Sequence, residues 1–324
     1  MNRYCFLPTA YCLLLIAAVT AGCASLPLRT GADPSAPSFA TDPYYSYAPR
    51  AVRATQTLLR TTRRFRQWQV TFPSAQPVLA EQETVTCEWF EPTRPGRHPA
   101  ILVYPILGGD YPIERGCAEY FARHGWHAVL IHREKYKFTR ERGIDYLEGL
   151  FRQGILKGRQ VVDWLTQQPG VDAAHLGGFG ISMGGIQAVI TAACEPRLTA
   201  HVICLAGGPV AELLTVTRDR VVARPRARYL EETGHDLAWL RAETARALRS
   251  DPVALAPAVR TSQVLCMTAA FDRTIPRHLS RRLWEALGRP RRLTVPFGHY
   301  TSILAMPYIR WRARQWYRAQ WDVR

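Results

Sequence analysis

The chain has 324 residues, of which 47% are hydrophobic, and this is enough for one large α/β core or two small domains. No unit of 20–50 residues repeats and no heptad pattern persists, which excludes solenoids and coiled coils. The formal net charge of +16 is carried mainly by arginine. We interpret it as a general bias of the composition toward arginine, and the alternative is that the charge serves to bind an anionic partner such as a membrane face. No zinc-finger or RNA-recognition signature accompanies the charge, so no nucleic-acid partner is expected.

An uncharged stretch follows Arg3 and extends through Leu28. Its most apolar part, residues 12–19, is too short to span a bilayer and fits the hydrophobic region of a signal peptide. The sequence Val-Thr-Ala-Gly-Cys-Ala-Ser at 19–25 resembles a bacterial lipoprotein cleavage site, although Thr20 stands where that family usually has leucine. The alternatives are an ordinary secretory signal and an N-terminal anchor.

The lipoprotein resemblance implies a signal peptide at 1–22 and a lipid on Cys23. Because Ala24 rather than aspartate follows the cysteine, it also implies sorting to the outer membrane of the bacterial envelope, facing the periplasm. The chain would then contact the membrane through this lipid. Residues 23–49 are rich in Pro, Ser, Ala and Tyr and read as a tether, and the domain proper is expected at 50–324.

Five cysteines remain after such processing, an odd number without a Cys-x-x-Cys pair. Cys204 and Cys266 lie in apolar strand-like runs and are expected to be buried. A disulfide among the other three, Cys87, Cys117 and Cys194, is left open by the sequence. A cysteine nucleophile is not expected.

Residues 50–66 are predicted to form a helix that carries six arginines. The favoured interpretation is a solvated helix face at the domain edge, and the alternative is a face that touches anionic lipid headgroups. Strand-like runs follow at 67–72 and 84–90. The continuous apolar run at 100–104 is typical of a parallel strand covered on both faces.

Further elements alternate between strand and helix, as in an α/β protein with a parallel sheet. They are a helix at 112–124, a strand at 127–132, a long helix at 141–168, a strand at 198–205, a strand at 263–270, a strand at 293–296 and a last helix at 308–321. Between 209 and 258 about fifty residues pass without a buried strand, which is too long for a plain loop. Helical signals there predict a helical lid inserted over the site.

A Gly-x-Ser-x-Gly pattern, centred on Ser182, lies between an apolar run and a helix-compatible segment. Strand, turn and helix together are the context in which this pattern exposes a nucleophilic serine. Gly180 and Gly184 remove Cβ atoms where the chain must reverse sharply. The backbone N–H of Met183, in the first helical turn, is then available to a developing negative charge.

Residues 161–185, together with this motif, resemble the dienelactone-hydrolase and prolyl-oligopeptidase-like branch of the α/β-hydrolase superfamily, and the likeness extends over about 98–320. It implies an α/β-hydrolase fold, a mostly parallel sheet with helices on both faces. It also implies a triad acid at Asp272 and a base at His299, each just past a strand, in the order Ser182, Asp272, His299. The backbone N–H of Ile106 is the implied second oxyanion donor, with Leu107 next.

These residues predict a serine hydrolase that acts on small carboxylic esters through an acyl-enzyme, with no metal or organic cofactor. A peptidase or acyltransferase with the same triad is the first alternative. A non-catalytic envelope lipoprotein that uses the fold as a binding scaffold is the second. The sequence does not give the acyl group, the alcohol or the oligomeric state.

Overall fold

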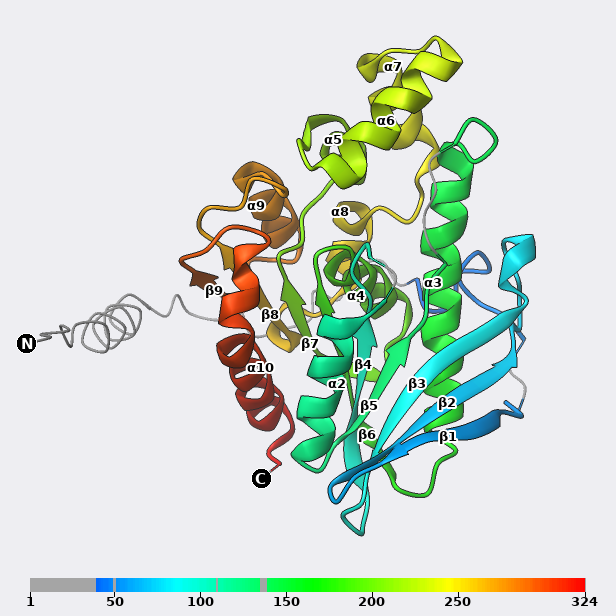
Figure 1. Cartoon of the computed structure of the whole chain (residues 1–324), viewed down its shortest axis with the longest axis vertical. Helices are drawn as coiled ribbons and strands as arrows, with labels where there is room; N and C mark the ends of the chain where they lie inside the picture. The colour runs from blue at the N-terminus through cyan, green and yellow to red at the C-terminus, as the bar shows by residue number, and fades with distance from the viewer. Residues whose placement is uncertain (1–38, 49–50, 109, 135–138, 324) are drawn as a thin grey trace, which may run out of the picture.

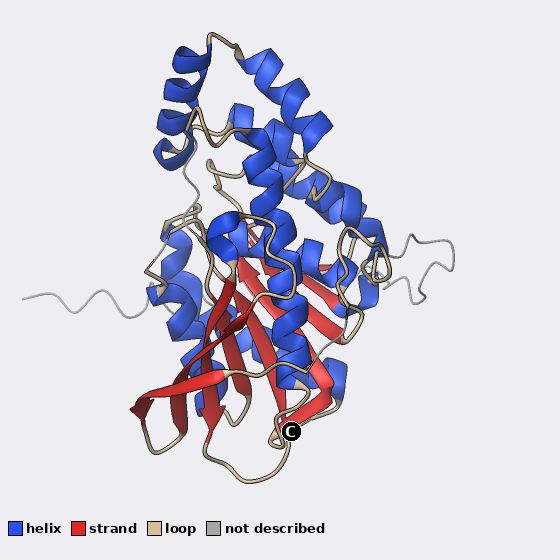
Figure 2. Cartoon of the chain, turned by 90° about the vertical axis from the view of Figure 1, so that its right-hand side faces the viewer, coloured by secondary structure: helices blue, strands red, loops and turns tan. Residues whose placement is uncertain are grey.

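The structure is a computed structural model that describes residues 39–48, 51–108, 110–134 and 139–323. The predicted signal peptide at 1–22, the predicted lipidation site Cys23 and most of the predicted tether lie outside these residues. The described strands form a single sheet with helices on both faces (Figures 1 and 2). They are β1 (Thr55–Thr61), β2 (Phe65–Pro73), β3 (Thr84–Pro92), β4 (His98–Tyr104), β5 (His127–Ile131), β6 (Val171–Ile181), β7 (Leu198–Cys204), β8 (Val264–Ala269) and β9 (Arg291–Val295).

The sheet has the order β1-β2-β3-β5-β4-β6-β7-β8-β9. Its first strands, β1, β2 and β3, pair antiparallel with one another, and β3 pairs antiparallel with β5. From β5 through β4 and β6 to β9 every pairing is parallel. The predicted mostly parallel α/β sheet is therefore confirmed, and the carboxyl ends of its parallel strands meet along one edge.

Two apolar cores lie on opposite faces of the sheet, and β4 contributes to both. Ala100 and Leu102 pack into one core, whereas Ile101 and Val103 pack into the other, as the alternation of side chains along a strand requires. The first core is covered by α3 (Ile144–Leu165), α4 (Met183–Cys194) and α9 (Arg277–Ala286). The second is covered by α2 (Pro112–Arg123) and α10 (Met306–Trp321).

The helix predicted at 50–66 is wrong, because this segment forms β1 and the first residues of β2. The turn between them is closed by Thr62, whose backbone N–H donates to the Phe65 carbonyl at 2.9 Å and whose Oγ1 accepts the Phe65 N–H at 3.0 Å. Threonine at 55, 57 and 61 favours a strand, and pairing with β2 supplies the backbone partners. Every residue of β1 is exposed. Its sequence therefore lacks the alternation of apolar and polar residues that marks a strand with one buried face.

The segment 209–258 between β7 and β8 is helical, as predicted. It contains α5 (Val210–Val216), α6 (Arg220–Thr233), α7 (Leu237–Ala247), α8 (Pro252–Leu255) and a 3-10 turn at Ala256–Ala258. In Figure 1, α5, α6 and α7 lie beyond the upper end of the sheet, on the side to which the parallel strands point. This insertion therefore stands over the edge where the strands end.

All five cysteines of the described segments have free thiols and are buried, including Cys204 and Cys266 as predicted. Within the same segments, no helix combines the length and the apolar character that crossing a membrane requires.

Candidate active site

Ser182 occupies the sharp turn between β6 and α4, with φ +56° and ψ −120°. A non-glycine residue with positive φ is strained and is held in place only by its surroundings. A Cβ on Gly180 would lie 2.0 Å from the Gly184 carbonyl oxygen, and one on Gly184 would lie 2.2 Å from the Tyr104 carbonyl oxygen. Both glycines of the motif are therefore needed for the backbone to approach so closely.

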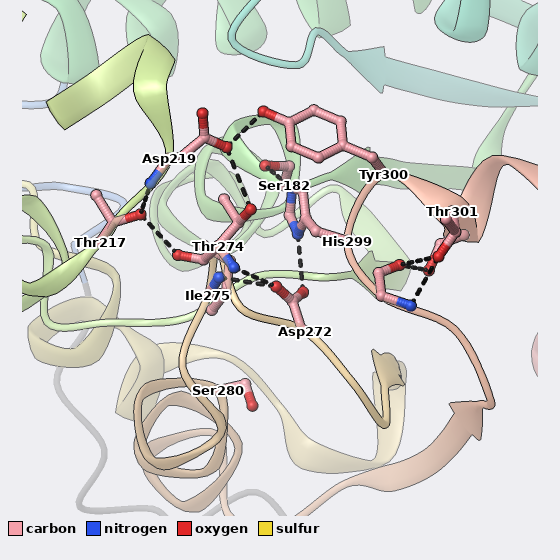
Figure 3. A network of polar contacts seen from close by, with 12 residues as sticks. Ser182, Thr217, Asp219, Asp272, Thr274, Ile275, Ser280, His299, Tyr300 and Thr301 are labelled. Atoms are coloured by element: carbon pink, nitrogen blue, oxygen red, sulfur yellow. Dashed lines mark hydrogen bonds and ion pairs between the residues drawn. The ribbon is translucent and has the colours of Figure 1, made fainter. Parts of the chain in front are cut away.

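Three side chains from distant parts of the chain form one hydrogen-bonded line (Figure 3). His299 Nε2 lies 3.0 Å from Ser182 Oγ, and His299 Nδ1 lies 2.8 Å from Asp272 Oδ2. The other carboxylate oxygen of Asp272 accepts the backbone N–H groups of Thr274 at 2.9 Å and Ile275 at 2.8 Å. The structure thus brings together the three residues that the sequence singled out.

This geometry holds the imidazole of His299 in one orientation between Ser182 and Asp272. The side chains of His299 and Asp272 are 10% and 8% exposed, so water has little access to the bond between them. The backbone donors hold the Asp272 carboxylate in one orientation, and the carboxylate in turn orients the imidazole. An imidazole held in this way can accept the proton of Ser182 Oγ while the oxygen attacks a carbonyl carbon.

The predicted oxyanion donors differ in their surroundings. Met183 is the first residue of α4, where the helix itself supplies no acceptor for the backbone N–H. The Ile106 N–H, in contrast, donates to Glu114 Oε1 at 2.6 Å, and Glu114 is 2% exposed. In this structure a buried carboxylate therefore occupies the N–H that was predicted as the second oxyanion donor.

Sequence reasoning did not identify Glu114, although a signal was present. The residue lies in the first turn of α2, directly after the loop that contains the predicted donor. Acidic side chains are common at this position because the unpaired N–H groups of the helix start stabilise their charge. Arg133 holds the same loop from its carbonyl side, donating to Ile106 O at 2.9 Å and to Leu107 O at 3.2 Å. The loop is therefore held by one acidic and one basic side chain.

A second group that sequence reasoning missed joins the helical insertion to the triad loops. Asp219 caps α6 by accepting the Val221 N–H, and its Oδ2 accepts the hydroxyls of Tyr300 and Thr274 (Figure 3). Burial raises the pKa of the Asp219 carboxyl, but hydrogen bonds from Tyr300, Val221 and Thr274 outweigh burial and hold it below its usual value. Burial and the bond to Asp219 raise the pKa of Tyr300 to about 12. Since Tyr300 follows His299, the insertion is hydrogen-bonded next to the imidazole.

Ser182 and His299 lie on the wall of a cavity of about 1160 Å³ that the insertion helps to enclose. Within the described ranges, no group of three or more His, Cys, Asp or Glu side chains is arranged to hold a metal ion.

No protein-family model and no curated protein sequence matches the chain. Solved structures do match in shape. An acetyl xylan esterase from a Paenibacillus species has a TM-score of 0.60 and 15% identity over 82% of this chain and 90% of its own. Acetyl xylan esterase 1 from a Thermoanaerobacterium species has a TM-score of 0.59 and 17% identity over 81% of this chain and 88% of its own.

A third similar structure is a 2,6-dihydroxy-pseudo-oxynicotine hydrolase, with a TM-score of 0.57 and 15% identity over 84% of this chain and 68% of its own. At such identities the likeness concerns the fold. The chain has the α/β-hydrolase fold, and its hydrogen-bonded serine, histidine and aspartate lie at the carboxyl ends of the parallel strands.

Proposed function

We propose that this protein is a serine hydrolase that cleaves carboxylic esters through an acyl-enzyme. The observation that carries the proposal is the hydrogen-bonded line from Ser182 Oγ through His299 to Asp272, on the wall of a large cavity. The strained backbone at Ser182 is a second support, because strain of this kind is stored where geometry matters to chemistry. The similar structures, which are two esterases and a hydrolase, agree with it.

In the first half-reaction, Ser182 Oγ attacks the ester carbonyl carbon while its proton passes to His299 Nε2. The carbonyl oxygen becomes an oxyanion, and the C–O bond to the alcohol then breaks as His299 returns the proton to the leaving oxygen. In the second half-reaction, water loses a proton to His299 and attacks the acyl carbon. As this intermediate collapses, the bond from the acyl carbon to Ser182 Oγ breaks, His299 returns the proton to Oγ, and the acid is released. The Asp272 carboxylate stabilises the imidazolium in both halves.

The oxyanion is proposed to accept the Met183 N–H first. A second donor comes from the loop after β4, at Ile106 once the Glu114 carboxylate gives way, or at Leu107. Loss of one donor in a site of this kind costs about 3 kcal/mol of transition-state stabilisation. The insertion at 209–258 is proposed to act as the lid of the cavity, shaping it and excluding water.

The test is hydrolysis of p-nitrophenyl butyrate by the full chain and by Ser182→Ala, together with labelling by a fluorophosphonate probe. We expect the wild type to label and to turn over, and the variant to do neither while keeping its circular dichroism spectrum. Turnover by Ser182→Ala at the wild-type rate would remove the mechanism. Product analysis with peptide substrates and with added alcohol acceptors separates ester hydrolysis from the peptidase and acyltransferase alternatives. A wild-type protein that never labels would favour a binding scaffold.

For residues outside the described segments we propose, from the sequence, that 1–22 are removed and that Cys23 carries a lipid. The domain would then be tethered to the outer membrane and face the periplasm. Metabolic labelling with a fatty-acid analogue in a Gram-negative host tests this, since the label should be present in the wild type and lost in Cys23→Ala. Equal labelling of both proteins would exclude lipidation at this cysteine.

A further inference from the structure

The cavity beside Ser182 is unusually large and its wall is mostly apolar. Its volume of about 1160 Å³ exceeds the ~300–1,000 Å³ common for small-molecule sites, and an acetyl group would fill a small part of it. The apolar side chains of its wall come from helices on several sides of the serine. They are Ile113 of α2, Leu147 and Phe151 of α3, Ile186 of α4, Val210, Leu213 and Leu214 of α5, Val221 and Val222 of α6, and Met306 of α10.

Polar side chains also line the cavity, but those near the triad bond to the protein itself. Thr217 Oγ1 donates to the carbonyl oxygen of Thr274 at 2.9 Å, and Ser302 Oγ donates to a backbone carbonyl at 2.7 Å. The hydroxyls of Tyr300 and Thr274 both donate to Asp219. Because their donors are already in use, these groups are poorly placed to bind the many hydroxyls of a sugar.

The edge of the cavity continues the apolar wall outward. Ile303, which lines the cavity, is 48% exposed, and its neighbour Leu304 is 71% exposed. Tyr300 and Phe271, which flank the triad histidine and aspartate in sequence, are 65% and 69% exposed. Of these four, Tyr300 and Ile303 line the cavity, and exposed apolar side chains at the edge of a cavity favour contact with an apolar ligand.

From these observations, and resting on the proposed hydrolase function, we propose that the substrate is a carboxylic ester with a long aliphatic chain. The chain would lie along the apolar wall formed by α3 and α5, away from the charged side chains that α6 also places in the cavity, with the ester carbonyl at Ser182. A sugar acetate of the kind named for two of the similar structures would leave this wall unfilled. Substrate class would then differ between proteins that share the fold, because the walls of the cavity differ.

The first experiment compares kcat/KM for p-nitrophenyl esters from acetate to decanoate, each below its critical micelle concentration, and for acetates of 1-alkanols of graded length. We expect kcat/KM to rise about threefold with each added methylene in at least one series, since each buried methylene contributes similarly to binding. In that series an eight-carbon chain should exceed a two-carbon chain by about 700-fold, because it has six more methylenes. Flat profiles in both series, or acetylated xylo-oligosaccharides cleaved faster than octanoate, would overturn the proposal.

The second experiment narrows the cavity with Leu213→Trp on α5. We expect the ratio of kcat/KM for octanoate to that for acetate to fall about tenfold or more, because the indole occupies the space of the chain. Leu237→Trp is the matched control, since Leu237 is 46% exposed on α7 and does not line the cavity. An unchanged ratio in Leu213→Trp would contradict the assigned wall.

The experiments distinguish failure of the hydrolase function from failure of the long-chain substrate class. If the protein is not a serine hydrolase, no ester is cleaved and the fluorophosphonate probe does not label Ser182. If it is a hydrolase with another substrate class, the probe labels and acetate is cleaved, but the chain-length profile stays flat.

Discussion

The backbone N–H of Ile106 donates to Glu114 Oε1 at 2.6 Å, so a buried carboxylate occupies the N–H that we proposed as a second oxyanion donor. Glu114 extends from the first turn of α2 back over the loop that follows β4. Within the described residues its other oxygen, Oε2, is buried without a hydrogen-bond partner. A carboxylate so placed competes with a developing oxyanion both for the N–H group and through its charge.

Replacement of Glu114 by glutamine is expected to raise kcat for p-nitrophenyl butyrate about fivefold. The amide oxygen still accepts the Ile106 N–H, but a hydrogen bond to a neutral acceptor is weaker than one to a carboxylate, so the carbonyl of the substrate displaces it more readily. Glu119→Gln on the same helix, whose carboxylate pairs with Arg60 away from the site, is the control. A fall in kcat for Glu114→Gln would mean that the carboxylate holds the loop in its productive shape instead.

Asp272→Asn is expected to lower kcat about 10⁴-fold and to leave the fold intact. The amide oxygen can still accept the Thr274 and Ile275 N–H groups, as Oδ1 does now. The amide NH₂ would then face His299 Nδ1 and favour the tautomer that cannot take the proton of Ser182. Steady-state kinetics and thermal unfolding measure the two effects, and near wild-type turnover would contradict the role of Asp272.

Gly180→Ala is expected to destabilise the protein by about 3 kcal/mol or more, because its Cβ would meet rigid backbone at 2.0 Å. Gly108→Ala is the matched control, since a Cβ there would meet Ile106 side-chain atoms at the ordinary distance of 3.9 Å. Urea unfolding of the two variants beside the wild type measures the difference. Equal stability of Gly180→Ala and Gly108→Ala would show that the turn is looser than described.

The free energy of unfolding should fall at acidic pH because the ionised carboxylate of Glu88 stabilises the fold. Glu88 lies in β3 and is 2% exposed. Burial raises the pKa of its carboxyl, but hydrogen bonds from His132 and Arg115 and their charges outweigh burial and lower it from 4.5 to about 2. The folded-state pKa is depressed, so the stabilisation is complete above the unfolded pKa and is lost as the pH falls from about 5 to about 2. About 3 kcal/mol depends on this shift.

Glu88→Gln tests that contribution through the free energy of unfolding in urea at pH 7 and at pH 3. The wild type should be the more stable protein at pH 7, and the difference between the two should shrink at pH 3, where the Glu88 carboxyl is protonated in the unfolded chain but still ionised in the folded one. A difference that stays constant across this range would assign the acid sensitivity to other carboxyls.

The parallel half of the sheet could be predicted from the sequence because its strands are covered on both faces and read as continuous apolar runs, such as that ending at Tyr104. The triad was predictable for a related reason, since Ser182, Asp272 and His299 each lie just past the carboxyl end of a predicted strand. The antiparallel edge was only partly predictable. In β1 the side chains are all exposed, and nothing in their order distinguishes a strand from a polar helix.

The contacts around the triad could not be predicted, because they depend on which loops meet in space. Asp219 and Tyr300 are 81 residues apart, and no sequence pattern in either segment predicts their hydrogen bond. The occupation of the Ile106 N–H by Glu114 depends on the direction in which one side chain turns at a helix start. Motif order therefore predicts the reacting groups, whereas their immediate partners require coordinates.

The arginines around β1 lie on an edge strand of the sheet and not on a helix face. An edge strand presents unpaired backbone N–H and C=O groups to which a strand of another chain can add, and such pairing leads to aggregation. Here the register shifts between Leu58 and Arg60, and Arg60 itself reaches Glu119 on α2. Long cationic side chains and an irregular edge are features that disfavour the addition of a strand from a second copy.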